Sequence, residues 1–208
     1  MSLFPKNVNY ISTRRYVEGG KSSSNFENFN LALHVNDKKV SVLENRSLLK
    51  DYYGLPSNPV WINQTHSAIC VNASSTKRIV EADASYTLDP EVICAILTAD
   101  CLPVFVSKKD GSMVRIAHAG WKGLISGVIE NLIESFHCNG GDLVVHLGPA
   151  ISKNFFEVGV EIKDLYLSKN SNFARSFSFY RYKYYLDLYD AAKVILESFN
   201  ITLISGGD

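Results

Sequence analysis

The stretch from Ile96 to Phe136 constrains the fold of this chain more than any other segment. It holds two apolar runs separated by Lys108-Lys109-Asp110-Gly111, and an Asp-Gly pair is a strong signal for a tight hairpin. The run that resumes at Val104 and the run from Met113 to Ala117 are therefore predicted to pair as neighbouring strands. Cys101 and His118 then lie at the ends of these strands, where polar side chains often form a site.

A long amphipathic helix is predicted directly after the hairpin. Apolar residues recur at helical spacing after Trp121 and form one stripe, which consists of Leu124, Ile125, Val128, Ile129, Leu132, Ile133 and Phe136. The Gly-rich run from Cys138 to Gly141 is typical of a helix end. The apolar run from Asp142 to Leu147 predicts a buried strand after that helix.

Helices and strands of mixed order are predicted along the rest of the chain. The helices are residues 40–53, stopped by Gly54, residues 161–167, and a last helix that starts at Asp187 or Leu188. The strands are residues 8–13, 60–64, 68–72 and 201–204, an extended piece at 155–159, and residues 91–98, which are apolar enough to be buried on both faces. This order favours an α+β fold with buried mixed sheets.

Composition limits the classes of function. The 208 residues fit a single domain, residues 1–208, and 46% hydrophobic and 20% charged residues are ordinary for a globular chain. The formal net charge is zero, so no overall field attracts nucleic acid or a membrane surface, and neither partner is expected. Four cysteines without a C-x-x-C pair, and an N-terminus without a signal-peptide pattern, predict free thiols in the cytoplasm.

His66, Cys101 and His118 are the candidate site residues, because each is predicted at a junction between a strand and a turn. Two imidazoles and a thiolate suit Zn²⁺ and leave a fourth position for water, whose pKa falls toward neutrality. The spacing of 35 and then 17 residues matches no general zinc motif. A Cys101 thiolate activated by one of the histidines is an alternative that the residues alone leave open.

Other polar residues accompany this set. Asp100 adjoins Cys101 and is interpreted as an acceptor for a ligand histidine or as a general acid or base. Lys122, in a Gly-Trp-Lys-Gly run, could hold phosphate, although glycines also serve tight packing. Asp83, between alanines, could approach a pocket or cap a turn, and Arg46 could face solvent or a site. The remaining histidines (His34, His137, His146) and cysteines (Cys70, Cys94, Cys138) are interpreted as structural.

Five short motifs in order resemble a known family over nearly the whole chain. They are residues 61–66 (WINQTH), 81–84 (EADA), 98–103 (TADCLP), 117–123 (AHAGWKG) and 147–151 (LGPAI). Together they are similar to the multicopper polyphenol oxidase (laccase) family, also called the YfiH family of purine nucleoside phosphorylases. The resemblance implies a single domain of layered mixed sheets flanked by helices.

The resemblance also implies an activity and a metal. It implies zinc, with copper as a less favoured option, held by His66, Cys101 and His118. It implies phosphorolysis of purine nucleosides, methylthioadenosine included, and deamination of adenosine, with nucleoside and phosphate as the partners. Asp100, Cys101 and His118 are then expected to be catalytic. Expected substrate-binding residues are Gln64, Asp83, Lys122 and Arg46.

Alternative functions remain open within the resemblance. They are hydrolysis of an amide in peptidoglycan precursors with Cys101 as nucleophile, a laccase-type phenol oxidation, and a binding protein without turnover. Ser67 stands where the family usually has Gly, and Lys122 where Arg is common. Phe155-Phe156 replaces a pair that often contains Cys. Relatives are also expected to continue beyond Asp208, which would leave part of the pocket wall absent here.

Overall fold

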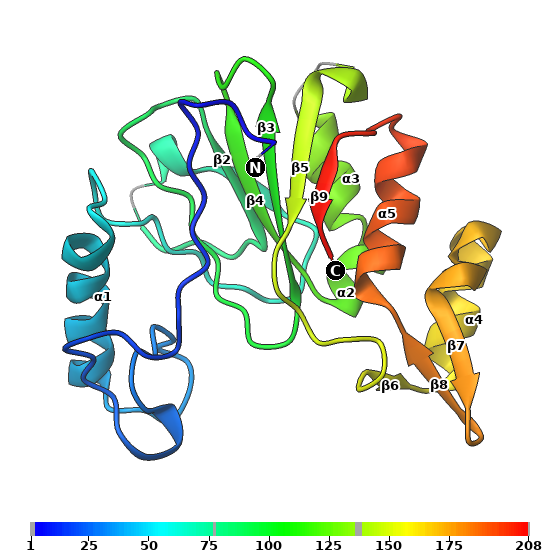
Figure 1. The fold of residues 1–208 in the computed structure, drawn as a ribbon, viewed down its shortest axis with the longest axis horizontal. Helices are drawn as coiled ribbons and strands as arrows, with labels where there is room; N and C mark the ends of the chain where they lie inside the picture. The colour runs from blue at the N-terminus through cyan, green and yellow to red at the C-terminus, as the bar shows by residue number, and fades with distance from the viewer. Residues whose placement is uncertain (1–2, 77, 136–138, 208) are drawn as a thin grey trace.

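A six-stranded mixed sheet forms the centre of the molecule, as the computed structural model of residues 3–76, 78–135 and 139–207 shows (Figure 1). Its strand order is β1-β2-β4-β3-β5-β9. The strands are β1 Cys70–Asn72, β2 Ala84–Thr87, β3 Leu102–Lys108, β4 Val114–Ala119, β5 Leu143–Leu147 and β9 Ile204–Gly206. β3 and β4 form the predicted hairpin, in which Gly111 donates its N–H to the carbonyl of Lys108 at a positive φ of 72°.

One face of this sheet is covered by helices α2 Trp121–Ser126, α3 Val128–Glu134 and α5 Leu188–Ser198 (Figure 1). The main core lies between them and includes Val104, Ala117, Leu132 and Ile195. α5 begins where the sequence predicts, because the Asp187 carboxylate caps it by accepting the N–H groups of residues 189 and 190. No helix of the described residues is long and apolar enough to cross a membrane.

Irregular segments cover the opposite face, and one of them corrects a prediction. Phe105 and Ile116 project to this face and pack with Phe4. Residues 91–98, predicted as a strand buried on both faces, form no strand; Cys94 makes a single bridge with Val60. Cys94 and Ile96 instead pack onto the outer face of the sheet. The apolar side chains of this segment are therefore explained by packing on the outer face of the sheet, not by pairing as one of its strands.

Helix α1, Lys39–Tyr53, forms a satellite with the N-terminal segment (Figure 1). The predicted stop at Gly54 is confirmed, since this residue adopts the left-handed conformation. A small separate core joins Val17, Phe29 and Leu49. The buried amide of Asn45 ties the N-terminal loop to the helix, because it accepts the N–H of residue 21 and donates to the carbonyl of residue 30.

A three-stranded sheet in the order β6-β8-β7 lies to one side of the main sheet (Figure 1). Its strands are β6 Glu157–Val158, β7 Phe177–Tyr180 and β8 Lys183–Leu186, and it carries helix α4 Val160–Lys169. The described part of the chain also holds four 3-10 segments. They are η1 Ser24–Phe26, η2 Ala73–Ser75, η3 Gly140–Asp142 and η4 Ser171–Ser176. The α+β class with mixed sheets is therefore confirmed.

The single long helix predicted after Trp121 is wrong, because the chain breaks it into α2 and α3. Gly127 separates the two helices with φ of 94°, a left-handed conformation. The apolar stripe survives the break, since Leu124, Val128 and Leu132 are all buried. The predicted end at Phe136 and the residues His137 and Cys138 lie outside the described residues.

Smaller differences concern the predicted strands. Residues 8–13 form no strand, and residues 60–64 make only the isolated bridges of Val60 and Asn63. The last strand is Ile204–Gly206 rather than residues 201–204. These short apolar runs pack their side chains against the protein but have no neighbouring strand to pair with over several residues. Sequence alone does not distinguish such a run from a paired strand.

Replacing Gly127 with Ala should destabilise the protein by about 1–2 kcal/mol, because a non-glycine residue is strained at this φ. The added Cβ meets nothing nearer than 3.8 Å, so the backbone alone carries the cost. Chemical denaturation measures the change. Gly141→Ala is the matched control, since it has no positive φ and open space around its Cβ. Equal stability of both variants would contradict this account of the break.

Candidate metal centre

His66, Cys101 and His118 meet at one edge of the main sheet. Cys101 directly precedes β3, His118 is the penultimate residue of β4, and the β3–β4 register sets Pro103 opposite His118. The ligand atoms of the three side chains lie within 4.8 Å of one another. The imidazoles of His66 and His118 meet edge to face, with ring centroids 4.9 Å apart. The sequence prediction that these residues converge is confirmed.

Asp83 fixes the orientation of His118. Its Oδ1 atom lies 2.8 Å from Nδ1 of the imidazole, and both side chains are buried. A ring nitrogen that bonds a carboxylate leaves the other nitrogen for a ligand, so Nε2 of His118 faces the site. Asp83 is held in place by its position just before β2, which pairs with β4.

The same carboxylate holds the loop that carries His66. It accepts the backbone N–H groups of Thr65, His66 and Ser67 at 2.6–3.1 Å, and the Ser67 hydroxyl at 2.8 Å. His66 adopts a φ of 59°, which is uncommon for a residue with a Cβ. The three N–H bonds therefore stabilise a tight turn that exposes the His66 imidazole beside the other two ligands.

Charge couples Asp83 and His118. Burial alone raises the pKa of Asp83, but bonds from His118, Ser67 and Thr65 outweigh it and bring the pKa to about 2. Burial lowers the pKa of His118, but its interactions with Asp83 and Cys101 outweigh burial and raise the pKa to about 9. Without a metal ion, the pair therefore stabilises an imidazolium at neutral pH, and a bound cation would take the place of that positive charge.

The residues fit a zinc ion in donor chemistry and in space. Two imidazoles and a thiol are the ligand types that zinc prefers in proteins, and three such ligands leave one position open. Gly120 supplies the room, because a Cβ there would lie 2.8 Å from the Cys101 Sγ atom and 3.2 Å from the His66 ring. The structure thus gives Gly120 a packing role at the ligands, as the Gly-Trp-Lys-Gly run suggested for its glycines.

Asp100 and Lys122 are exposed near this edge. Asp100 precedes Cys101, and its backbone carbonyl accepts the N–H of Ile151, which ties the loop after β5 to the site. Lys122 lies in the first turn of α2, with its ammonium 5.5 Å from the Trp121 ring. Both side chains remain predictions as catalytic and phosphate-binding groups, and their exposure leaves them accessible to a substrate.

Gln64, Asp83 and Arg46 have structural partners. The amide of Gln64 donates to the carbonyl of Leu97 and accepts its N–H, at 2.8 and 2.7 Å. Arg46 donates Nε to the carbonyl of Leu31 and stacks on the Trp61 ring at 4.0 Å, and burial lowers its pKa. These contacts favour positioning roles over the substrate contacts predicted from the sequence. The sequence did not predict the supporting roles of Trp61, which stacks on Arg46, or of Ser67, which bonds Asp83. Trp61 begins the motif at residues 61–66, and Ser67 directly follows it.

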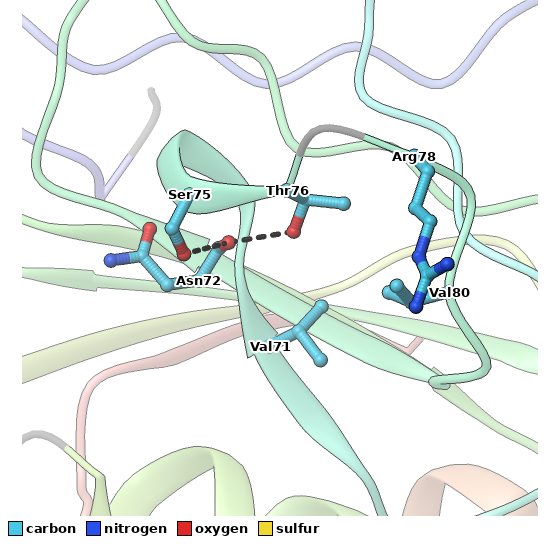
Figure 2. A pocket seen from close by; sticks show the side chains of 6 residues that line it. All are labelled: Val71, Asn72, Ser75, Thr76, Arg78 and Val80. Atoms are coloured by element: carbon cyan, nitrogen blue, oxygen red, sulfur yellow. Dashed lines mark hydrogen bonds between the residues drawn. The ribbon is translucent and has the colours of Figure 1, made fainter.

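A separate hollow opens among the described residues (Figure 2). It measures about 610 Å³ and includes none of the three metal-competent residues. The hydroxyls of two lining residues donate to the Asn72 carbonyl, so they are already engaged. Its lining is Val71, Asn72, Ser75, Thr76, Arg78 and Val80.

Two further histidines lie outside the metal centre. His34 is exposed, and His146 is a structural residue whose Nδ1 bonds the Ser205 hydroxyl at 3.0 Å.

Comparison with known proteins places this chain in a family. Residues 9–208 match the model of the multi-copper polyphenol oxidoreductase laccase family. A Haemophilus influenzae protein named purine nucleoside phosphorylase is 37% identical over 207 residues, which is 98% of this chain and 84% of that protein. The purine nucleoside phosphorylase YfiH of Escherichia coli is also 37% identical, over 208 residues with the same coverage.

Solved structures agree with this placement. The crystal structure of Neisseria meningitidis protein NMB0706 has a TM-score of 0.93 at 36% identity and covers 100% of this chain and 85% of its own. That of YlmD from Geobacillus stearothermophilus has a TM-score of 0.81 at 25% identity and covers 90% and 76%. On the family model and on these relatives, the chain belongs to the YfiH and laccase-domain family of proteins.

Proposed function

We propose that this chain is a zinc-dependent purine nucleoside phosphorylase that also deaminates adenosine and cleaves methylthioadenosine. One observation carries the proposal: two imidazoles and a thiol converge within 4.8 Å in a chain 37% identical to proteins named purine nucleoside phosphorylase. Adenosine, inosine, guanosine and methylthioadenosine are the expected substrates, with inorganic phosphate as the second reactant.

Phosphorolysis and deamination use different nucleophiles, phosphate in the first reaction and water in the second. In phosphorolysis a phosphate oxygen bonds to C1′ of the sugar, the bond from C1′ to the purine nitrogen breaks, and that nitrogen receives a proton. In deamination water adds at C6 and ammonia leaves. A zinc ion held by His66, Cys101 and His118 would supply Lewis-acid chemistry for these steps.

The side chains of this chain supply orientation and proton transfer. Asp83 keeps the proton of His118 on Nδ1, so that Nε2 remains a donor of electrons to the metal. Asp100 is exposed beside Cys101 and is the proposed group that exchanges a proton with the leaving base. Lys122 is proposed to bind phosphate through its ammonium group.

The alternative that this chain is a copper-dependent phenol oxidase, as the family name suggests, has less support. A multicopper centre needs many imidazole or thiol ligands, and the described residues bring only three metal-competent side chains together at this edge. A single copper ion on this set remains an outcome that metal analysis would detect. A cysteine hydrolase is favoured by no separate observation, although the close approach of Cys101 to His118 is compatible with it.

Removing a ligand should abolish metal binding and turnover together. Zinc-loaded protein is expected to convert adenosine and phosphate to adenine and ribose 1-phosphate, and adenosine to inosine. His118→Ala and Cys101→Ala should lower both rates by about 100-fold or more, with matching loss of zinc in elemental analysis. His34→Ala, at an exposed histidine, is the control. Zinc-loaded protein that turns over none of the four nucleosides would refute the proposal, and full activity of metal-free protein would refute zinc dependence.

Asp83→Asn should weaken the site without removing a ligand. The variant loses the charge that stabilises His118 and the turn at His66, so zinc affinity should fall by about 10–100-fold. Breaking this buried pair should also destabilise the protein by about 3 kcal/mol. Zinc competition titrations and chemical denaturation measure the two effects. Asp110→Asn, in the exposed hairpin turn, should change neither, and wild-type zinc affinity in Asp83→Asn would disprove the positioning role.

Zinc affinity should rise with pH up to about 9, because the pKa of His118 is raised to about 9 and a ligand imidazole must lose its proton. Calorimetry in buffers of different ionisation enthalpy should detect the proton released. In metal-free protein the pair's contribution to stability should be complete between about pH 4 and pH 6.5, the ordinary pKa values of the two side chains, and should be lost as the pH rises through 9 or falls toward 2. A pH-independent zinc affinity between pH 6.5 and 9 would contradict the assigned protonation of His118.

A further inference from the structure

The hairpin of β7 and β8 presents aromatic side chains to solvent, and none of them belongs to the candidate metal centre. Phe179, Tyr180 and Tyr182 are 60%, 59% and 95% exposed, and we call these three residues the aromatic tip. Phe179 packs against Tyr184 across the hairpin, with ring centroids 4.8 Å apart. Large aromatic side chains exposed together mark an interaction surface more often than single exposed ones do.

The turn of the hairpin is strained in a way that exposes Tyr182. Arg181 and Tyr182 occupy the two turn positions with φ of 47° and 65°. A two-residue turn of this type favours Asn-Gly, since both positions need positive φ. Two bulky side chains there cost stability without contributing to the core, which indicates that the aromatic tip is retained for contact with another molecule.

β7 is also an open edge. Among the residues that the structure describes, β8 is its one neighbour in the small sheet, and the register sets Tyr180 opposite Lys183. Because the residues that close a two-residue turn are hydrogen-bonded, the backbone N–H and C=O of Phe179 are directed away from β8. The strand Phe177–Tyr180 carries no charge or proline to block pairing with another strand.

We propose that the β7 edge and the aromatic tip bind the same surface of a second copy of this chain. Antiparallel pairing of β7 with itself places Phe179 on the two-fold axis, where its outward N–H and C=O bond to Phe179 of the second copy. Tyr180 then lies opposite Ser178 of the second copy, so a large side chain meets a small one. This pairing joins the two small sheets into one sheet of six strands.

Area and charge favour a second copy over other partners. At about 200 Å² for a full aromatic side chain, the aromatic tip exposes on the order of 400 Å², roughly half of what one partner buries in a standard interface. The formal net charge of the chain is zero, so two copies do not repel each other. Lys183 is paired with Glu157 at 2.6 Å, and the Arg181 guanidinium lies over the Tyr180 ring. The aromatic tip is thus flanked by two basic residues, fewer than the clusters of about four to eight that bind anionic membranes.

Sedimentation velocity over a series of protein concentrations tests the proposal. The wild-type chain of 23.2 kDa should approach twice that mass as concentration rises. Phe179→Pro removes the outward N–H and the ring but no bond to β8, and should weaken dimerisation by about tenfold or more. Phe155→Ser, which removes an exposed aromatic residue outside the hairpin, is the control and should leave the dimer unchanged.

Tyr182→Gly separates binding from folding. Glycine relieves the strained turn, so thermal stability of the monomer should stay the same or rise while the dimer weakens. A wild-type chain that stays monomeric at all concentrations overturns the proposal, whether or not it then sediments with vesicles of anionic lipid. Dimerisation that is unaffected by Phe179→Pro and Tyr182→Gly also overturns it, because the interface would then lie elsewhere.

Discussion

The Asp83 carboxylate is the interaction on which the candidate metal centre depends. One buried charge accepts three consecutive backbone N–H groups, a serine hydroxyl and an imidazole N–H. Leaving such a charge unpaired in the interior would cost several kcal/mol, so the turn at His66 and the orientation of His118 are fixed together. Ligands 52 residues apart in sequence thus share one anchor, although no bond joins the two imidazoles directly.

Sheet register places this anchor. Asp83 directly precedes β2, and the β2–β4 register sets Ala84 opposite Ala117, which brings Asp83 alongside His118. The β3–β4 hairpin then brings the segment of Cys101 to the same edge. Ala84, Ala117 and Ala119 are fully buried, and their small size lets the strands carry polar neighbours close to the core. The alanines beside the polar residues therefore contribute to the site by leaving it room.

The sequence predicted correctly those turns and helix ends that depend on a few neighbouring residues. The Asp110-Gly111 hairpin, the Gly54 stop of α1 and the Asp187 cap of α5 are each determined by a few neighbouring residues, and each is confirmed. Convergence of His66, Cys101 and His118 was predicted from strand ends and from family resemblance. The structural roles of Gln64 and Arg46 could not be predicted, since their partners Leu97 and Leu31 are distant in sequence and are bonded through backbone carbonyls.

The break between α2 and α3 shows why the helical period alone misled. Leu124 and Val128 keep the apolar stripe on both sides of Gly127, so the pattern contains no sign of a break except the glycine. The break frees the carbonyl of Ile125, and Lys169 of α4 donates to it at 3.1 Å while bonding Glu130 of α3 at 2.7 Å.

A second side chain of α4 holds the other end of α2. The buried Tyr166 hydroxyl donates to the carbonyl of Trp121 at 2.7 Å, one residue after the glycine that packs on Cys101. Helix α4 therefore bonds both ends of α2, and at the C-terminal end it uses the Ile125 carbonyl, which an uninterrupted helix would have used internally. The break in the helix thus provides one of the bonds that attach α4 to the main sheet, beside the packing of Tyr166 in the main core.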